Sequence, residues 1–242
     1  MSFPTSTMHP PLKRDLGEAI ELIRNVPFFT ELDRLNLEKI VRVGVRKKCK
    51  RGNFIFQEDD PGAALFVIIS GSIKITRAGD DGREVILSIL GEHDFFGEMS
   101  ILDGLTRSAS AVAITDVQLF TIHQRDFLAL LEEVPSVALA LLRELAIRLR
   151  KAGAQIKSLS LKDTSGRVAN VLIQLADEIG TIRKGRVEID ELPLQQDLGN
   201  MAGTSRESVS RMIHSFMKQG HIELEGNKLI INDYEKFKGA FT

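Results

Sequence analysis

The residues best suited to chemistry in the first half of the chain lie between Phe95 and Ser110, in the stretch FFGEMSILDGLTRSAS. Gly97 opens a short serine-bearing segment that can expose consecutive backbone N–H groups, and Arg107 can bind a phosphate through two parallel hydrogen bonds. Glu98 repels a phosphate, so it must face a neutral or positive group, such as a sugar hydroxyl or Arg107. A phosphate on one side and a hydroxyl on the other describe a nucleotide. The alternative is a surface loop closed by a Glu98–Arg107 ion pair.

A second group of polar residues lies in GTSRESVSR, from Gly203 to Arg211. Four of them share one face near the N-terminus of an expected helix, at positions i, i+1, i+4 and i+5: Arg206, Glu207, Ser210 and Arg211. Arginine pairs with guanine O6 and N7, and glutamate can accept a hydrogen bond from cytosine N4. Because a carboxylate is unfavourable in a phosphate-rich groove, Glu207 favours base reading over simple charge attraction. The alternative is that these residues are only solvated charges on a helix surface.

Neither group contains the parts of an enzyme. The sequence has no paired nucleophile and base and no phosphate-loop lysine motif. Its five histidines lack the spacing of metal ligands: His9, His93, His123, His214 and His221. Cys49 is the only cysteine, which excludes an internal disulfide and any cysteine-ligated cluster built within one chain. We therefore expect a binding protein with no catalytic activity and no metal site, in which Cys49 is an ordinary strand residue.

Composition places both groups in an ordinary globular chain. With 242 residues and 43% hydrophobic content, we expect two domains, each with its own core. No run approaches the roughly 20 apolar residues of a membrane helix, and Met1–Pro11 lacks the apolar stretch of a secretory signal. These features predict a cytoplasmic protein with no membrane partner. The net charge of −1 does not indicate nucleic-acid binding, but a reader helix needs only a local group of basic residues.

Helices followed by strands are expected to position the first group. After a tail of residues 1–11, the segment Leu12–Val43 has a helical pattern with a break at Asn25–Pro27. From Val43 to Ile122 the period shifts to two and glycines recur at short intervals, which predicts strands at 54–56, 65–69, 73–75, 85–90, 109–114 and 117–122. Asp80-Asp81-Gly82 predicts a hairpin turn. Short strands with frequent turns predict a compact all-β barrel or sandwich.

Residues Pro135–Lys162 predict one long helix that pairs with its own copy. Apolar residues recur at alternating spacings of four and three, the pattern of a two-stranded coiled coil: Ala138, Leu142, Leu145, Leu149, Ala152, Ile156 and Leu159. Pro135 suits the first turn, because that position needs no amide donor. The alternative is a helix buried within one monomer, but an unbroken register over three heptads favours pairing.

Short elements after residue 162 are expected to position the second group. Asp163–Gly166 is a polar hinge, in which Ser or Thr caps a helix from Val168 to Ile179 that ends at Gly180. The pattern then predicts a strand at 188–189 and two helices, at 194–201 and 206–219. Thr204 or Ser205 caps the second helix, and two strands follow, at 222–224 and 228–231. Helix, tight turn, second helix and hairpin is the order of a winged helix-turn-helix.

Gly97-Glu98, followed nine residues later by Arg107-Ser108, resembles the phosphate-binding cassette of the cyclic-nucleotide-binding domain. The next domain, with its Ser-Arg-Glu signature at 205–207 and Arg211, resembles the DNA-binding half of the cyclic-AMP receptor protein and FNR superfamily. This resemblance covers about residues 25–234. It implies an α+β fold with an N-terminal β-roll, a long dimerisation helix and a C-terminal winged helix-turn-helix. The implied boundaries are 1–24 for the N-terminal tail and helix, 25–134 for the roll, 135–162 for the helix and 163–242 for the DNA-binding domain.

The same resemblance implies two sets of site residues. The ligand set holds the ribose and cyclic phosphate in the cassette and the base against roll strands: Gly97, Glu98, Met99, Ser100, Arg107, Ser108, Ile75, Leu87 and Ser88. The DNA set reads bases or positions the helix on phosphates: Gln196, Ser205, Arg206, Glu207, Ser208, Ser210 and Arg211. We therefore expect one ligand site in the roll and one DNA-reading surface in the C-terminal domain.

The resemblance implies a homodimeric transcription regulator that binds a near-palindromic operator in double-stranded DNA and responds to a cyclic nucleotide such as cyclic AMP. One departure concerns the ligand. Cyclic-AMP-responsive members carry a Thr-Ser pair on the long helix, whereas the matching positions here, Ala152 and Gly153, have no polar side chain. The alternative is a regulator with another ligand, or with none, whose roll only supports dimerisation. Residues 80–84 of the predicted roll hairpin and 181–186, predicted to be a loop, are candidate contacts with RNA polymerase.

Overall fold

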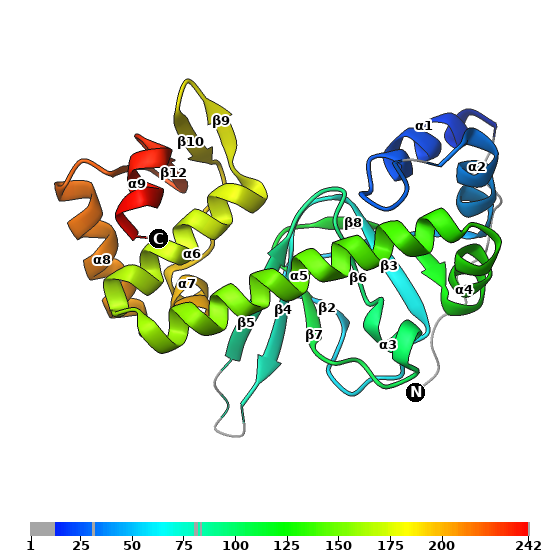
Figure 1. Ribbon diagram of the computed structural model, residues 1–242, viewed down its shortest axis with the longest axis horizontal. Coiled ribbons are helices and arrows are strands. Elements are labelled where there is room, and N and C mark those ends of the chain that lie inside the picture. The colour runs from blue at the N-terminus through cyan, green and yellow to red at the C-terminus, as the bar shows by residue number, and fades with distance from the viewer. Residues whose placement is uncertain (1–12, 31, 80–81, 83, 242) are drawn as a thin grey trace.

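Strands and helices segregate along the chain, as the change of period predicts (Figure 1). The computed structural model describes residues 13–30, 32–79, 82 and 84–241. A β-roll with flanking helices lies on one side, a smaller helix-and-hairpin domain lies on the other, and helix α5 (Pro135–Leu161) runs between them. This arrangement confirms the predicted α+β fold. No helix in the described ranges is long and apolar enough to cross a membrane.

The roll consists of two antiparallel four-stranded sheets, with the orders β1-β8-β3-β6 and β2-β7-β4-β5. Its strands are β1 (Val45–Cys49), β2 (Phe54–Phe56), β3 (Ala64–Ser70), β4 (Ile73–Ala78), β5 (Glu84–Leu90), β6 (Phe95–Phe96), β7 (Ser110–Ala113) and β8 (Val117–His123). Alternate side chains from both sheets form the core between them. The rings of Phe56, Phe66 and Phe96 meet there at centroid distances of 5.2–5.7 Å.

Helices cover the other face of the β1-β8-β3-β6 sheet. They are α1 (Lys13–Arg24), α2 (Arg34–Val43), α4 (Gln124–Glu133) and the first turns of α5, whereas α3 (Met99–Asp103) follows β6. In this second core the Phe28 ring meets Phe95 and Phe127 edge-on. Val137 and Leu141 are buried in the same core, so the start of α5 is anchored to the roll.

The C-terminal domain packs helices against a small sheet of order β11-β12-β10-β9. Its elements are α6 (Thr164–Ile179), β9 (Thr181–Arg183), β10 (Arg186–Ile189), α7 (Gln195–Ala202), α8 (Arg206–Lys218), β11 (Ile222–Glu225), β12 (Lys228–Ile231) and α9 (Tyr234–Phe241). Phe216 of α8 and Phe237 of α9 meet edge-on in the core. The order of these elements confirms the predicted winged helix-turn-helix.

The junction between α5 and α6 is shorter than predicted. Residues 164–166 form the first turn of α6, so the predicted polar hinge is wrong. The cap is Asp163, whose carboxylate accepts a hydrogen bond from Gly166 N–H at 2.8 Å, and not the predicted Ser or Thr. Gly180 ends α6 as predicted. A Cβ at this position would lie 2.4 Å from Ala176 O, so the position requires glycine. Lys162 and Asp163 alone therefore separate two helices.

The two segments predicted as polymerase contacts differ in how the structure describes them. Residues 181–186 were expected to be a loop but form β9, a turn and the start of β10, which pair as a hairpin. Asp80-Asp81 of the predicted turn and the tail of residues 1–11 lie outside the described residues. Strands β4 and β5 on either side of that turn do pair in antiparallel register, as the hairpin prediction requires.

The C-terminal domain is docked on strand β5 of the roll. Ile86 and Ile89 of β5 are buried in the same core as side chains of α6 and α7. Beside them, the ammonium of Lys74 lies 2.7 Å from Glu84 and 3.0 Å from Asp197 of α7. Burial alone lowers the pKa of Lys74, but hydrogen bonds to Glu84 and Asp197 outweigh it and raise that pKa. An apolar contact and a largely buried charge cluster therefore join the domains.

Replacing Lys74 with methionine is expected to destabilise this docking by about 1–3 kcal/mol, because Glu84 and Asp197 lose their shared cation inside the interface. The folded pKa of Lys74 is raised, so this stabilisation is fully present below the ordinary lysine value and is lost as the pH rises through the folded value. Thermal unfolding measures the change. Lys50→Met is the matched control, since the Lys50–Asp116 pair is exposed, and equal effects would contradict the prediction.

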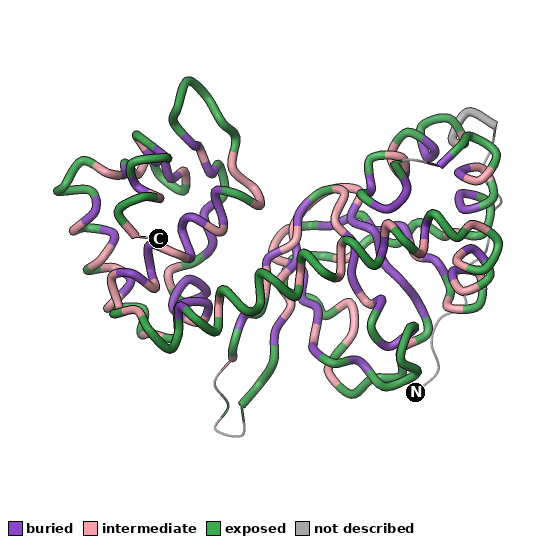
Figure 2. The backbone as a smooth tube through the Cα atoms, viewed as in Figure 1, coloured by how far each residue is buried: buried purple, intermediate pink, exposed green. Residues whose placement is uncertain are grey.

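Beyond its anchored start, α5 is largely exposed to solvent (Figure 2), and its exposed residues include large apolar ones. Leu142, Leu149 and Ile156 are 62%, 74% and 65% exposed, respectively. Ala138 and Leu145 of the predicted heptad series are half-buried instead, and Leu145 packs against the core under the roll helices. A row of exposed leucine and isoleucine along one helix is not the pattern of a helix buried within a monomer.

Candidate functional site

Gly97 lies where the chain leaves β6 and approaches α3. Its φ of 83° is left-handed, and a Cβ there would lie 2.7 Å from a guanidinium nitrogen of Arg107, so the position requires glycine. Ser100, in α3, is buried, and its hydroxyl accepts a hydrogen bond from Arg107 at 2.9 Å. The structure therefore brings Gly97, Ser100 and Arg107 into one group.

Arg107 is 4% exposed and lies beneath this segment. Its guanidinium donates to Gly97 O at 2.7 Å and to Ala64 O at 2.8 Å, and it stacks 4.2 Å from the centre of the Phe56 ring. Its Nε–H is buried without a hydrogen-bond partner in the described structure. Burial lowers the pKa of Arg107, an effect that the charges of Glu98 and Asp60 oppose. The described residues thus hold a buried cation with no ion-pair partner among them.

Glu98 is 5% exposed, and its carboxylate pairs with Arg148 of α5 at 3.2 Å. Arg148 also donates to Phe95 O at 2.7 Å, and its guanidinium lies 4.0 Å from the centre of the Phe95 ring. The alternative of a surface loop closed by a Glu98–Arg107 pair is therefore wrong, because Glu98 is buried and its cation comes from the long helix. Arg148 is a site residue that the sequence analysis missed, although it lies one helical turn before Ala152.

Met99 and Ser108 lie at the exposed edge of the same group. Met99 begins α3, and the hydroxyl of Ser108 donates to its sulfur at 3.5 Å. Neither side chain is held by the buried contacts that fix Gly97, Ser100 and Arg107. The cassette therefore has a buried, rigid part and an exposed part.

A cavity of about 430 Å³ lies beside Arg148, between β5, α5 and α6. Leu87 and Ser88, two of the residues predicted to lie against a base, line it together with Ala152. Ile75 does not line it: Ile75 pairs with Ser88 across the sheet but packs in the core between the two sheets. A second cavity of about 450 Å³ adjoins it and also reaches Leu87. The cassette residues 97–100 and 107–108 line neither cavity. The predicted ligand residues therefore lie in two places, the cassette and the cavity, and Arg148 contacts both.

Two carboxylates face this cavity with perturbed acidity. Burial raises the pKa of Asp94 and of Glu178. The ammonium of Lys151 lies 3.3 Å from Glu178 and opposes that rise. Glu178 belongs to α6, so one wall of the cavity comes from the C-terminal domain. No sequence motif marks Glu178, since its position depends on how the domains dock.

The reader helix α8 begins at the cap Ser205, whose hydroxyl accepts from Ser208 N–H at 3.2 Å. Arg206, Glu207 and Arg211 are exposed, and Arg211 donates to the Ser208 hydroxyl at 3.0 Å. Hydrogen bonds from its own backbone N–H and from Ser205 lower the pKa of Glu207. Ser210 is half-buried on the same helix, and the opposite face is buried through Val209, Ile213 and Phe216. The polar face of α8 is therefore open to a partner.

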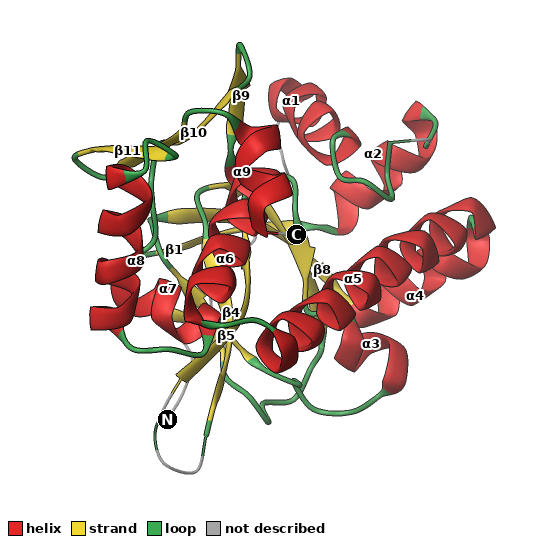
Figure 3. Ribbon diagram, turned by 60° about the vertical axis from the view of Figure 1, so that its left-hand side comes forward, coloured by secondary structure: helices red, strands yellow, loops and turns green. Residues whose placement is uncertain are grey.

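A tight turn holds α7 beside α8 (Figure 3). Gly203 ends α7 with a left-handed φ of 58°, and a Cβ at Gly199 would lie 2.8 Å from Thr204 O. Gln196 is exposed on α7, where its amide donates to Asn200 at 3.1 Å. This close approach of two helices fixes how α8 projects from the domain, which is the geometry of a helix that enters the major groove.

Two parts of the chain match known protein families. Residues 46–134 match the cyclic nucleotide-binding domain, and residues 166–239 match the Crp-like helix-turn-helix domain. The chain is 38% identical over 186 residues to a CRP-like cAMP-activated global transcriptional regulator of Mycobacterium tuberculosis, a match that covers 77% of this chain and 83% of that protein. It is 35% identical over 202 residues to the cyclic AMP receptor protein of Thermus thermophilus, covering 84% and 90% of the two chains.

A solved structure shows the same fold. The structure of FixK2 from Bradyrhizobium japonicum matches with a TM-score of 0.74 and 22% identity, over 83% of this chain and 98% of that one. From the two domain matches and the similarity to these regulators, the chain belongs to the CRP/FNR superfamily of DNA-binding transcription regulators.

Proposed function

We propose that this regulator is a homodimer that binds a near-palindromic operator, and that a cyclic nucleotide, with cyclic AMP as the first candidate, binds between the roll and α5 and changes its affinity for DNA. Buried Arg107, a cation without an ion-pair partner among the described residues, is the observation that supports this most strongly. A cyclic phosphate monoanion supplies the missing negative charge. The domain match and the cAMP-activated relative support the same ligand class.

The donor set of the cassette fits such a ligand. The Arg107 Nε–H is an unsatisfied buried donor, and Gly97 leaves room beside the guanidinium that any side chain would fill. Glu98 is held by Arg148, so its charge is balanced and its carboxylate can accept a hydrogen bond from a ribose hydroxyl. Gly97, Glu98, Ser100 and Arg107 would hold the ribose and phosphate, with Met99 and Ser108 at the edge.

Ligand control would act through α5, because Glu98 and the cavity wall both contact that helix through Arg148. The exposed apolar face of α5 supports a dimer whose seam runs along Leu142, Leu149 and Ile156. A ligand that binds one arrangement of the two long helices better than another shifts the spacing of the reader helices. The two α8 helices would then read half-sites about one helical turn apart.

One observation favours the alternative of a ligand-independent regulator. The Arg107 guanidinium already donates to two carbonyls and a hydroxyl of the protein, and Ala152 and Gly153 offer no polar side chain to a base. Titration calorimetry with cyclic AMP and cyclic GMP, followed by operator binding with and without nucleotide, separates the two functions. Saturable binding with a changed operator affinity is expected. An absence of binding to both nucleotides, with operator affinity intact, would establish the roll as a scaffold.

Replacing Arg211 with alanine is expected to weaken operator binding by about 1–3 kcal/mol and binding to random DNA much less, because the exposed guanidinium would read a guanine edge. Fluorescence anisotropy at one fixed salt concentration, with a duplex selected from a random pool and with a scrambled duplex, measures both losses. Lys218→Ala, at the exposed far end of α8, is the control. Equal losses on both duplexes would mean that Arg211 contacts only phosphates.

A contact with RNA polymerase is the remaining part of the proposal. The β9–β10 hairpin projects from the DNA-binding domain, and its strand β9 and turn are exposed and offer an accessible surface for it. The second candidate, residues 80–84, lies partly outside the described residues. Cross-linking of the operator-bound protein to polymerase tests the β9–β10 contact.

A further inference from the structure

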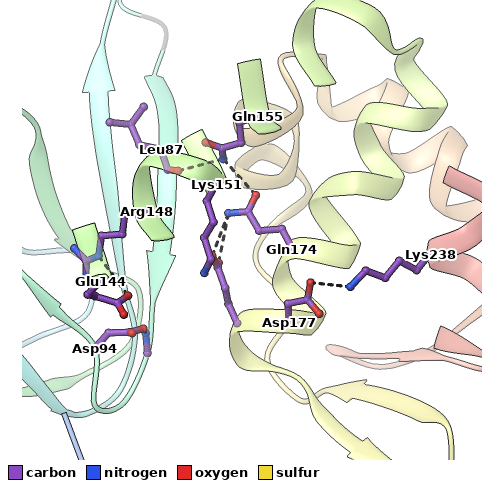
Figure 4. Close-up of polar contacts among 11 residues, drawn as sticks. Leu87, Asp94, Glu144, Arg148, Lys151, Gln155, Gln174, Asp177 and Lys238 are labelled. Carbon is purple, nitrogen blue, oxygen red and sulfur yellow. Dashed lines mark hydrogen bonds and ion pairs between the residues drawn. The ribbon is translucent and has the colours of Figure 1, made fainter. Parts of the chain in front are cut away.

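Three elements from both domains enclose the cavity beside Arg148 (Figure 4). Leu87 of β5 lies on one side, Ala152 and Gln155 of α5 form the second wall, and Gln174 of α6 lies on the third. Ala152 matches a position at which cyclic-AMP-responsive members of the family carry a polar residue. Gln155 lies three residues later, half-buried, with its side-chain amide between the two domains.

The orientation of the Gln155 amide follows from its neighbours. Its Nε2 donates to Leu87 O at 3.3 Å and to Gln174 Oε1 at 3.3 Å. A backbone carbonyl can only accept, so the nitrogen and not the oxygen of Gln155 must face Leu87. The next amide agrees, because Gln174 Nε2 donates to Glu178 at 3.3 Å and so turns its own oxygen toward Gln155. The orientations of both amides are therefore fixed: Gln155 donates to Leu87 and to Gln174, and Gln174 donates to Glu178.

These bonds leave one polar atom of Gln155, its Oε1, without a partner among the described residues. Both N–H groups of the amide are used, whereas no residue in the described part of the chain donates to its Oε1. Gln155 lines the cavity, and the carbonyl oxygen of an amide is a strong acceptor. Of the polar atoms of Gln155, Oε1 is therefore the one left to bind a ligand in the cavity, three residues after Ala152 on α5.

We propose that Gln155 sets the base specificity of the effector by accepting a hydrogen bond from the exocyclic amino group of a 6-aminopurine, a role that rests on the proposed cyclic-nucleotide site. A 6-oxopurine presents an oxygen at the same position. Two acceptors then face each other, and the amide cannot turn without giving up its bonds to Leu87 and Gln174. Gln174 is a positioning residue: it holds the amide of Gln155 in the reading orientation from within the DNA-binding domain.

Cyclic AMP and cyclic inosine monophosphate are suitable probes, because they share ribose, phosphate and ring and differ at the exocyclic group. Titration calorimetry is expected to show that the wild type prefers cyclic AMP by about 10-fold or more. Gln155→Met keeps the length of the side chain but removes the acceptor, so the preference is expected to fall to about 2-fold or less. Gln174→Leu is expected to reduce the preference by freeing the amide to turn, without abolishing binding.

Gln118→Met makes the same chemical change on an exposed position of β8 and is expected to keep the wild-type preference. A wild type that binds both nucleotides equally, or a Gln155→Met variant that binds with the full wild-type preference, would overturn the role of Gln155 while leaving the nucleotide site intact. A wild type that binds neither nucleotide would overturn the ligand part of the proposed function as well. Circular dichroism of each variant verifies that the fold is kept.

Discussion

Replacing Arg107 with alanine is expected to abolish the binding of cyclic nucleotides while leaving the long helix and the DNA-binding domain folded. The guanidinium is the one cationic group that lies directly against Gly97 and Ser100 among the described residues. It is almost wholly buried, so a phosphate that reaches it is screened little by solvent, and its loss removes charge-assisted hydrogen bonds with no replacement. Titration calorimetry with cyclic AMP measures the loss.

The controls separate charge from structure. Arg77→Ala removes an exposed arginine of the same roll, whose partner is Glu58, and is expected to leave nucleotide affinity unchanged. Arg107→Lys keeps the cation without its planar fork and is expected to retain weak binding. Operator binding without nucleotide reports whether Arg107→Ala has disturbed the rest of the protein. Full nucleotide affinity in the alanine variant would refute the cassette assignment.

Strand and helix periods predicted most of the fold but not helices α3, α4 and α9 or strands β1, β6 and β9, and these three strands share a physical cause. Strand β1 has the sequence VRKKC with an exposed face, so it lacks the apolar alternation that marks a strand and is stabilised by pairing with β8. Strand β6 has two residues, and β9 is exposed throughout. These segments become strands because of a partner distant in sequence, which local periodicity does not register.

The local motif of the site could be predicted from the sequence, but the contacts between distant elements could not. Gly97 and Arg107 lie ten residues apart, so their motif is visible in the sequence. The partner of Glu98 is fifty residues away on α5, and Gln174 reaches the cavity only because the C-terminal domain docks on Ile86 and Ile89. Burial of these two isoleucines looks in the sequence like ordinary strand alternation. The wall of the cavity therefore follows from domain docking, which the sequence pattern does not specify.

Replacing Leu149 with aspartate is expected to convert the dimer to a monomer and to lower operator affinity by about 10³-fold or more. Leu149 is 74% exposed in one protomer and lies at the centre of the predicted heptad seam. In a two-stranded seam it faces the same residue of the partner, so the substitution buries two like charges against each other at a cost of several kcal/mol. A monomer contacts one half-site and keeps little of the specificity of a dimer.

Sedimentation equilibrium and operator binding, measured on the same samples, test this prediction. Arg150→Asp is the matched control: it changes the next residue on the helix by a larger charge but lies on the outer side of the predicted heptad, where it is exposed. That variant is expected to remain a dimer. A dimer that survives Leu149→Asp would place the interface on another face of the molecule and would refute α5 as its seam.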